Sequence, residues 1–436
     1  MALIYDFLSE DDGLINHPVN GFLPRKAIIP LKKTDENDIK ILVEEGATVS
    51  EGQTIAKSHD VSVHASIPGK VESIFVTTFP DGSEGYVAQI KLSGSFSYTG
   101  KKQPLVNWQN YDKNTICYMM ADKGVVNTFS KTLPLAKLVK NPDSEILVVR
   151  LYSEDPSRVT DGFITSHYFE KIREGALITA KAMDAKALVF AYDINQNVQE
   201  AEKPTHAGLP VFFVGLDAKS YPCGFSHEIV RQVKNTLKDP LLRKLGNKDL
   251  FIDVQTALSV YEAIALGIPV MSRYVHVTGL CLNAAAVTKV KIGTTLSDLA
   301  QQCGSFKRKT AKIIINGIVT GNTLASFDVP VSKYVKSVVF MPQSQLPDQK
   351  QENCVRCGNC LKICPAGLFP ESLYRCATKE NEVDEHENLI KQTAVLCTEC
   401  ALCNSVCPSR LPLSQTISSL KIKNPPISVE EKADEK

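Results

Sequence analysis

The chain has 436 residues, which is enough for three or four domains of ordinary size. Its 49 basic and 48 acidic residues leave a net charge of +1, so composition gives no support for binding to nucleic acid or to an anionic membrane surface. The N-terminus lacks the features of a signal peptide, and no apolar run reaches about 18 residues. We therefore expect a multidomain protein that is neither exported nor membrane-spanning.

Residues 1–105 consist of short segments in which apolar and polar side chains alternate, separated by Gly, Pro and Asp turns. This alternation is typical of short antiparallel strands. The clearest strands are predicted at 38–43, 69–76 and 86–92. The pattern predicts a small β barrel or sandwich as the first domain.

Residues 106–248 change to an alternation of strands and helices. Buried strands are predicted at 145–151, 186–192 and 209–215, with a helix at 167–183 between the first two. Such βαβ units favour a mostly parallel sheet. We expect a Rossmann-like α/β domain here.

Residues 249–345 predict a compact α+β domain, in which Gly267 and Pro269 end the first helix. A polar linker at 348–352 follows, and residues 424–436 have the composition of a disordered tail. The elements predicted in the α+β domain are helices at 250–266 and 296–302 and strands at 270–277, 287–292 and 312–315.

Nine of the 13 cysteines lie between Cys354 and Cys407 and form the run C-x2-C-x2-C-x3-C-P twice, at 354–365 and 397–408. In a reducing compartment, such dense cysteines favour metal ligation over disulfides. Three thiolates at this spacing lie on one tight loop, whereas the fourth opens the next helix and points away. In two-cluster ferredoxins the fourth cysteine therefore binds the other cluster.

These runs predict two [4Fe–4S] clusters in a ferredoxin-like helical domain at 346–423, with helices at 371–374 and 387–390 covering the clusters. Zinc is less suited to triplets with a distant partner, and structural thiols are a further alternative. Cys376 lies outside both runs and is expected to be a buried or incidental thiol. The small residues Gly358 and Ala401 let backbone N–H groups approach sulfide. Cluster one is assigned Cys354, Cys357, Cys360 and Cys407, and cluster two Cys397, Cys400, Cys403 and Cys364.

Over nearly its whole length the chain resembles RnfC, the C subunit of the Rnf electron-transport complex, a membrane-bound ion-pumping assembly. It also resembles the related cobalamin reductases and the A subunit of sodium-pumping quinone reductases. The resemblance implies a lipoyl-like barrel-sandwich at 1–105, a counterpart of the FMN/NADH-binding domain at 106–248 and an SLBB-like β-grasp domain at 249–345. The stretches that carry it are 364–368, 406–413, 49–56, 63–71, 254–257, 272–279 and 290–294. Lys57 lacks the context of a carrier lysine and is expected to be a surface residue.

The middle domain departs from the family at three segments. The family's loop G-x-G-G-A-x-F-P-T, where glycines admit phosphate to the backbone, corresponds to residues 123–138, which keep one glycine. The family's N-G-A-E-C-E-P segment is replaced by a different sequence at 149–156. Its Tyr-Pro segment, which is followed by paired glycines and a glutamate, has lost one glycine and the glutamate at 221–226. These losses predict a degenerate site for FMN and NADH, with Lys131 and Lys137 as solvated surface lysines.

The resemblance implies an iron–sulfur subunit that relays single electrons through the two clusters, peripheral on the cytoplasmic face of the inner membrane. Its partners would be the membrane subunits of an Rnf-type complex and a small carrier such as ferredoxin or flavodoxin. Three alternatives are a working FMN-containing NADH dehydrogenase subunit, a soluble corrinoid-reductase-like adaptor and clusters with a purely structural role. No catalytic residue is assigned. We expect 413–423 to be a packing helix, and His64 and His276 to be core or surface residues rather than ligands.

Overall fold

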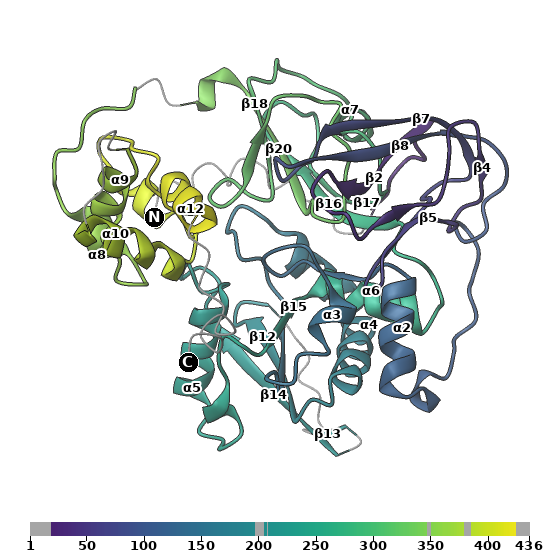
Figure 1. Cartoon of the computed structure of the whole chain (residues 1–436), viewed down its shortest axis with the longest axis horizontal. Helices are drawn as coiled ribbons and strands as arrows, with labels where there is room; N and C mark the ends of the chain where they lie inside the picture. Colours follow the sequence, from purple (N-terminus) through teal and green to yellow (C-terminus); the bar gives the residue numbers. More distant parts are fainter. Residues whose placement is uncertain (1–18, 197–204, 207, 347–349, 379–384, 424–436) are drawn as a thin grey trace. The chain divides into compact units, whose positions relative to one another are not determined.

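The computed structural model describes residues 19–196, 205–206, 208–346, 350–378 and 385–423 (Figure 1). Within it the chain divides into two units, residues 1–345 and 346–436, each of which is described by itself. The predicted tail at 424–436 lies outside the described residues.

The N-terminal part is built from two small sheets that face each other across an apolar core. One has the strand order β2-β8-β7-β4 and the other β3-β5-β6. Their inward side chains, among them Ile29, Ile55 and Ile90, are fully buried. Of the predicted strand 38–43 only two residues pair as β3. The strands are β2 Lys26–Lys33, β3 Lys40–Ile41, β4 Thr48–Val49, β5 Thr54–Lys57, β6 Ser62–His64, β7 Gly69–Thr78 and β8 Glu84–Leu92.

The next sheet has the order β13-β14-β12-β11-β15, and its last four strands are parallel. Alternate residues of β11 face opposite cores: Leu147 and Val149 pack with helices α4 and α6, whereas Val148 packs with α5. Helices therefore cover both faces, as Figure 1 shows. The elements are β11 Ile146–Arg150, α4 Thr160–Ala182, β12 Ala187–Asp193, β13 Thr205–His206, β14 Leu209–Leu216, α5 Ser226–Thr236, β15 Leu250–Asp253 and α6 Val254–Ile264.

The prediction of a helix from residue 250 is wrong at its start. Leu250–Asp253 forms the strand β15, which pairs in parallel with β11, and the helix begins only at Val254. The side chain of Asp253 accepts a hydrogen bond from the backbone N–H of Thr256 and so caps α6. The apolar run at 250–252 is too short for its periodicity to distinguish a buried strand from a buried helix. The N-cap Asp253 marks where the strand ends and the helix begins.

Helix α4 also begins earlier than predicted, at Thr160 rather than at residue 167. Tyr168 interrupts it with non-helical angles of φ −134° and ψ 24°, which explains why the helical spacing is clear only beyond that point. The segment before the interruption is buried at Thr160, Asp161 and Ile164. It lies at the charged cluster described below.

A mixed sheet of order β1-β17-β16-β20-β18-β19 completes the first unit. The predicted strands 270–277, 287–292 and 312–315 correspond to β16, β17 and β18, and the predicted helix 296–302 is α7. The elements are β1 Val19–Asn20, β16 Ser272–Thr278, β17 Ala286–Lys291, α7 Leu296–Gln302, β18 Lys312–Ile315, β19 Asn322–Leu324 and β20 Ser337–Met341.

Further short elements connect these sheets or form the second unit. In the first unit they are η1 Trp108–Asn110, α2 Lys113–Asp122, β9 Val126–Asn127, β10 Leu133–Pro134, α3 Leu135–Leu138, η2 Leu242–Lys244 and η3 Gln343–Gln345. The second unit is helical, with α8 Asn359–Ile363, α9 Pro370–Thr378, α10 Glu385–Gln392, η4 Thr393–Leu396, α11 Leu402–Ser405 and α12 Leu413–Lys423.

A buried ion pair joins the barrel-sandwich to the mixed sheet. The Oε1 atom of Glu51 lies 2.7 Å from the Nζ atom of Lys291, 240 residues along the chain. The second carboxylate oxygen accepts the backbone N–H groups of Ser97, Tyr98 and Thr99. Burial alone would raise the pKa of Glu51, but these partners outweigh it and lower the pKa to about 2.

Replacing this carboxylate is expected to destabilise the first unit. Glu51→Gln should lower the free energy of unfolding by about 3 kcal/mol at pH 7, because Lys291 is left buried without its counter-ion. The control Glu72→Gln removes an exposed pair with Lys26 and should cost less than about 1 kcal/mol. Chemical denaturation followed by far-UV circular dichroism measures both.

The same pair sets a pH dependence. Glu51 has a folded-state pKa of about 2, below its ordinary value of 4.5, so its contribution is complete above about pH 4.5 and is lost as the pH falls toward 2. The stability difference between the wild type and Glu51→Gln should therefore shrink over that interval. A difference that stays constant from pH 6 to 3 would contradict the assignment.

Candidate functional site

Both cysteine runs fold into the same loop. In the first, Arg356 and Gly358 have positive φ angles of 50° and 74°; in the second, Glu399 and Ala401 have 60° and 56°. Each pair occupies equivalent positions of its run. Glycine adopts this conformation without strain, whereas the other residues are held in it by the loop. A short helix, α8 or α11, begins directly after the second left-handed residue.

This geometry points backbone N–H groups at sulfur. The backbone nitrogen of Arg356 lies 3.4 Å from the Sγ atom of Cys354, and that of Glu399 lies 3.4 Å from the Sγ atom of Cys397. The N–H of Leu368 contacts the Sγ atom of Cys364, also at 3.4 Å. Hydrogen bonds of this kind stabilise thiolates and adjust the reduction potential of iron–sulfur clusters.

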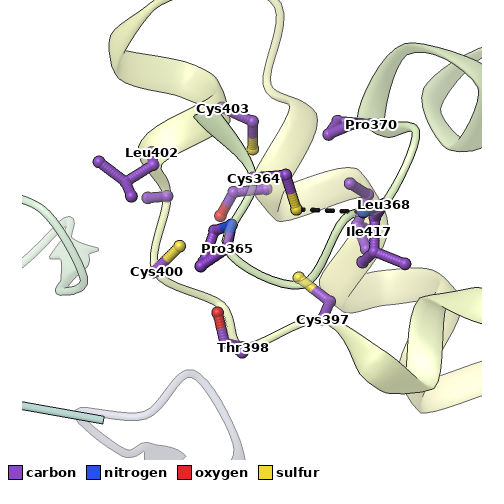
Figure 2. A pocket seen from close by; sticks show the side chains of 12 residues that line it. Cys364, Pro365, Leu368, Pro370, Cys397, Thr398, Cys400, Leu402, Cys403 and Ile417 are labelled. Carbon is purple, nitrogen blue, oxygen red and sulfur yellow. Dashed lines mark hydrogen bonds between the residues drawn. The ribbon is translucent and has the colours of Figure 1, made fainter. Parts of the chain in front are cut away.

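Four cysteines line one cavity in the second unit (Figure 2). Cys397, Cys400 and Cys403 come from the loop of the second run, and Cys364 reaches the cavity from the end of the first run. The cavity encloses about 340 Å³, its open mouth included. Its apolar wall is formed by Pro365, Leu368, Pro370, Leu402 and Ile417. The structure thus brings together the four residues that the sequence assigned to cluster two.

The donor set fits an iron–sulfur cluster. Burial, followed by the neighbouring thiols Cys397 and Cys400, raises the pKa of Cys403 to about 12, so its thiolate needs a positive partner such as iron at neutral pH. No disulfide joins any of the 13 cysteines, all of which lie in described residues. Within the described ranges, no three His, Cys, Asp or Glu side chains converge as ligands of one metal ion do.

The cysteines assigned to cluster one lie nearer the surface. Cys354 and Cys357 are exposed, and Cys360 and Cys407 are half-buried. The segment after Cys407 is tied to the first loop, because the N–H of Glu352 donates to the carbonyl of Ser409 at 3.0 Å and the Ser409 hydroxyl donates to the carbonyl of Asn353 at 2.8 Å. Helix α8 packs against α11 in the same region.

The helices around the loops are packing elements. Leu413, Ile417 and Leu420 of α12 are buried, the last two against Leu368 and Leu373, in agreement with the expectation for 413–423. Cys376 is buried in α9, and it is not among the residues that line the cavity. In the described ranges no helix is both long and apolar enough to cross a membrane.

One contact of α12 was not indicated by the sequence. The Nζ atom of Lys421 donates to the carbonyl of Cys397 and to the carboxylate of Glu399, each at 2.8 Å. The helix therefore supplies a cation to the second cysteine loop as well as an apolar face.

A second feature lies at the carboxyl end of the parallel sheet. Strands β12 and β14 follow β11 on one side, and β15 lies on its other side. The carboxyl ends of β11 and β15 therefore form a topological switch point, where open α/β sheets bind their ligands. The last residues of these two strands are Arg150 and Asp253.

All three segments that depart from the family pattern meet at Arg150. Its side chain is 1% exposed and donates from Nη1 to the carbonyl of Gly224 at 2.6 Å and from Nε to the carbonyl of Tyr152 at 3.0 Å. Its guanidinium carbon lies 4.2 Å from the centre of the Phe129 ring. Its Nη2 atom also contacts the carboxylate of Glu154. The side chain therefore connects residues from 123–138, 149–156 and 221–226.

Further charges extend this cluster. Asp253 lies 2.7 Å from the Nζ atom of Lys336 and accepts a hydrogen bond from the Thr128 hydroxyl at 2.7 Å. Burial alone would raise the pKa of Asp253, but Lys336 and then Arg273 hold it well below its usual range. The eight side chains of the switch-point cluster are Arg150, Arg158, Arg273 and Lys336 with Glu154, Asp155, Asp161 and Asp253.

The two glycines that remain in these segments pack against protein. A Cβ atom on Gly124 would lie 2.2 Å from the carbonyl oxygen of Ser62, and one on Gly224 would lie 2.5 Å from the Cα atom of Glu154. Both close approaches are therefore to the chain's own backbone. Lys131 and Lys137 are exposed, as expected.

The remaining candidates are accounted for by packing or by surface pairs. Lys57 lies 3.7 Å from the carboxylate of Asp122. His64 and His276 are buried in strands. Burial, with the charge of Lys333, lowers the pKa of His64 to about 3, so this imidazole is neutral at physiological pH.

Comparison with known proteins gives two family matches. Residues 16–93 match the RnfC barrel sandwich hybrid domain, and residues 350–411 match the 4Fe–4S dicluster domain. The chain is 28% identical over 383 residues to the C subunit of the proton-translocating ferredoxin:NAD(+) oxidoreductase complex of Clostridium ljungdahlii, covering 84% of this chain and 82% of the relative. The chain is therefore similar to RnfC proteins.

A further relative of this RnfC-like chain is the C subunit of the ion-translocating oxidoreductase complex of Rhodobacter capsulatus, at 26% identity, covering 80% of this chain and 70% of the relative. Among solved structures, a chain of an NAD+-reducing [NiFe]-hydrogenase in the H2-reduced state has a TM-score of 0.48 at 11% identity. That match covers 74% of the RnfC-like chain and 63% of the hydrogenase chain.

Arg150 is predicted to be essential to the stability of the RnfC-like chain's first unit. Arg150→Ala leaves Glu154 with one fewer cation and the Gly224 carbonyl without its donor, which should cost about 3–5 kcal/mol. The fluorescence of Trp108, the single tryptophan, reports unfolding of this unit. The control Arg173→Ala removes an exposed pair and should cost less than about 1 kcal/mol. Equal losses in the two variants would contradict the prediction.

Proposed function

We propose that this chain is the iron–sulfur electron-transfer subunit of a membrane-bound, ion-translocating oxidoreductase complex of the Rnf type. The observation that carries the proposal is the cavity in which Cys364 of the first run joins three cysteines of the second. This arrangement is the one expected of a two-cluster ferredoxin. The names of the curated relatives agree with it, since both are C subunits of such complexes.

The proposed ligand sets follow the exchange of the fourth cysteine. A [4Fe–4S] cluster, when bound, accepts and returns one electron at a time. At cluster two, the chain's own residues would supply four thiolates, direct the backbone N–H of Leu368 at the sulfur of Cys364 and exclude water with the apolar side chains of Leu368 and Ile417. Cluster one is held by Cys354, Cys357, Cys360 and Cys407, and cluster two by Cys397, Cys400, Cys403 and Cys364.

We propose that the middle domain no longer binds FMN or NADH. Phosphate binding at such a sheet requires backbone N–H groups that a ligand can approach. Here the buried side chains of Arg150 and Tyr152 fill the switch point, and the remaining glycines Gly124 and Gly224 pack against the chain itself. A working flavin-dependent NADH dehydrogenase, the main alternative, would need this crevice open.

The finer domain assignments form a consistent scheme. We propose that residues 1–105 form the barrel-sandwich, 106–248 a Rossmann-like scaffold, 249–345 an SLBB-like β-grasp domain and 346–423 the two-cluster domain. Without flavin, electrons would come from a small reduced protein such as ferredoxin or flavodoxin. The membrane subunits of the complex would hold the chain at the cytoplasmic face of the inner membrane.

The exchange of ligands between the two runs is testable by paired substitutions. Cys364→Ala and Cys397→Ala should each lose the same cluster and give matching EPR spectra of the reduced protein, with about four irons remaining. Cys407→Ala and Cys354→Ala should match each other and lose the other cluster. Cys376→Ala is the control and should keep both clusters. A spectrum of Cys364→Ala that matches Cys354→Ala would exclude the exchange.

The loss of the dinucleotide site is tested with the complete, reconstituted chain. NADH should not reduce the clusters or an artificial dye, and added FMN should be removed by gel filtration. Dithionite, which needs no binding site, should reduce the clusters in the same sample and serves as the control. Rapid dye reduction by NADH, or retention of one FMN per chain, would refute this part of the proposal.

A further inference from the structure

The two cysteine loops carry opposite charges at the same position. Arg356 of the first run and Glu399 of the second each follow the first cysteine by two residues, with nearly the same backbone conformation. Glu399 is neutralised by Lys421 of α12 at 2.8 Å. Arg356 is exposed, and within the described residues no ion pair involves its guanidinium. The charge of Glu399 in the second loop is therefore compensated within the chain, whereas the first loop presents the exposed cation Arg356.

The two loops also differ in burial. In the second, Cys400 and Leu402 are 7% and 8% exposed. In the first, Val355 is 67% exposed and Leu361 is 39% exposed, on either side of the exposed Cys357 in the sequence. Apolar side chains at the surface beside a redox site are typical of a surface that another protein covers.

Two more exposed cations lie close in sequence to the cysteines assigned to cluster one. Lys362 is exposed on α8, two residues after Cys360, and Arg410 is exposed three residues after Cys407. Arg410 is held near the first loop, because the adjacent Ser409 bonds both Asn353 and Glu352. Glu352 is an exposed acid in the same segment. The cationic loop surface, defined as Val355, Arg356, Leu361, Lys362 and Arg410, thus comprises three exposed cations and two exposed apolar side chains on the segments that carry the cysteines assigned to cluster one.

We propose that the cationic loop surface is the docking site of a small electron-carrier protein whose redox centre is surrounded by carboxylates. Opposite charges accelerate encounter and fix orientation, while the apolar centre excludes water. Docking here places the carrier against the loop of Cys354, Cys357 and Cys360. A cluster bound by that loop would accept one electron from the reduced centre of the carrier, so that the carrier is oxidised by one electron and the cluster is reduced by one. This inference rests on the proposed electron-transfer function.

The test uses the full chain with both clusters and a purified two-cluster ferredoxin of net negative charge as the probe. Isothermal titration calorimetry should show binding that weakens as salt rises from about 20 to about 300 mM, a range that spans weak to strong screening. Arg356→Glu and Lys362→Glu should each weaken binding about tenfold at low salt. Arg356→Gln should have a smaller effect in the same direction.

Lys391→Glu is the control, because Lys391 lies on α10, which packs against α9 and η4. It should leave the affinity unchanged. Iron content and dithionite-reduced EPR spectra verify that each variant keeps two clusters. Unchanged binding by Arg356→Glu, equal weakening by Lys391→Glu, or no binding at low salt would overturn the docking proposal.

The two proposals fail in different ways. If the clusters are reduced by dithionite but the ferredoxin does not bind, only the docking site is wrong. If the ferredoxin binds with the expected charge dependence but the clusters cannot be reduced, the electron-transfer function is wrong and the docking surface stands.

Discussion

In the proposed ligand sets, each cysteine run supplies three thiols from its loop, and the fourth ligand of each cubane comes from the other run. This constraint makes the two repeats one folding unit, because neither site is complete alone. The cavity shared by Cys364 and the second loop is where the constraint is visible in the structure. Metal binding and folding are expected to be coupled, since the proposed ligands come from two segments that meet only in the folded chain.

The first unit contains a different kind of constraint. Eight charged side chains, nearly all of them buried, gather at the switch point, and removal of Glu154 or Asp253 would deprive buried cations of their shortest ion pairs. The cluster occupies the place where a doubly wound sheet binds its ligand. We propose that these buried side chains occupy the position of a ligand crevice. The domain would then have a structural role, and redox chemistry would be confined to the cysteine loops.

Much of this could be predicted from local pattern. The spacing of the cysteines, together with the exchange of the fourth cysteine in two-cluster ferredoxins, predicted which four residues share the cavity. Three of the four parallel strands, β11, β12 and β14, were predicted closely by their apolar runs. Helix α12 was predicted to pack, and its buried residues agree.

Other features depend on contacts between distant residues and had no local signal. Residues 250–252 form a short apolar run that suits a buried strand or a buried helix equally, and only the pairing with β11 decides between the two. The substitutions near residues 129, 150 and 224 were visible one by one, but their convergence on Arg150 is a tertiary property. The pairing of Lys421 with Glu399 likewise exists only in the folded chain.

The central claim is that this chain carries two cubanes and no flavin. Its most direct test is the determination of iron, acid-labile sulfide and flavin in one anaerobically purified sample of the complete chain. We predict about eight irons and about eight sulfides per chain with no flavin. About four irons, or one flavin per chain, would contradict the account.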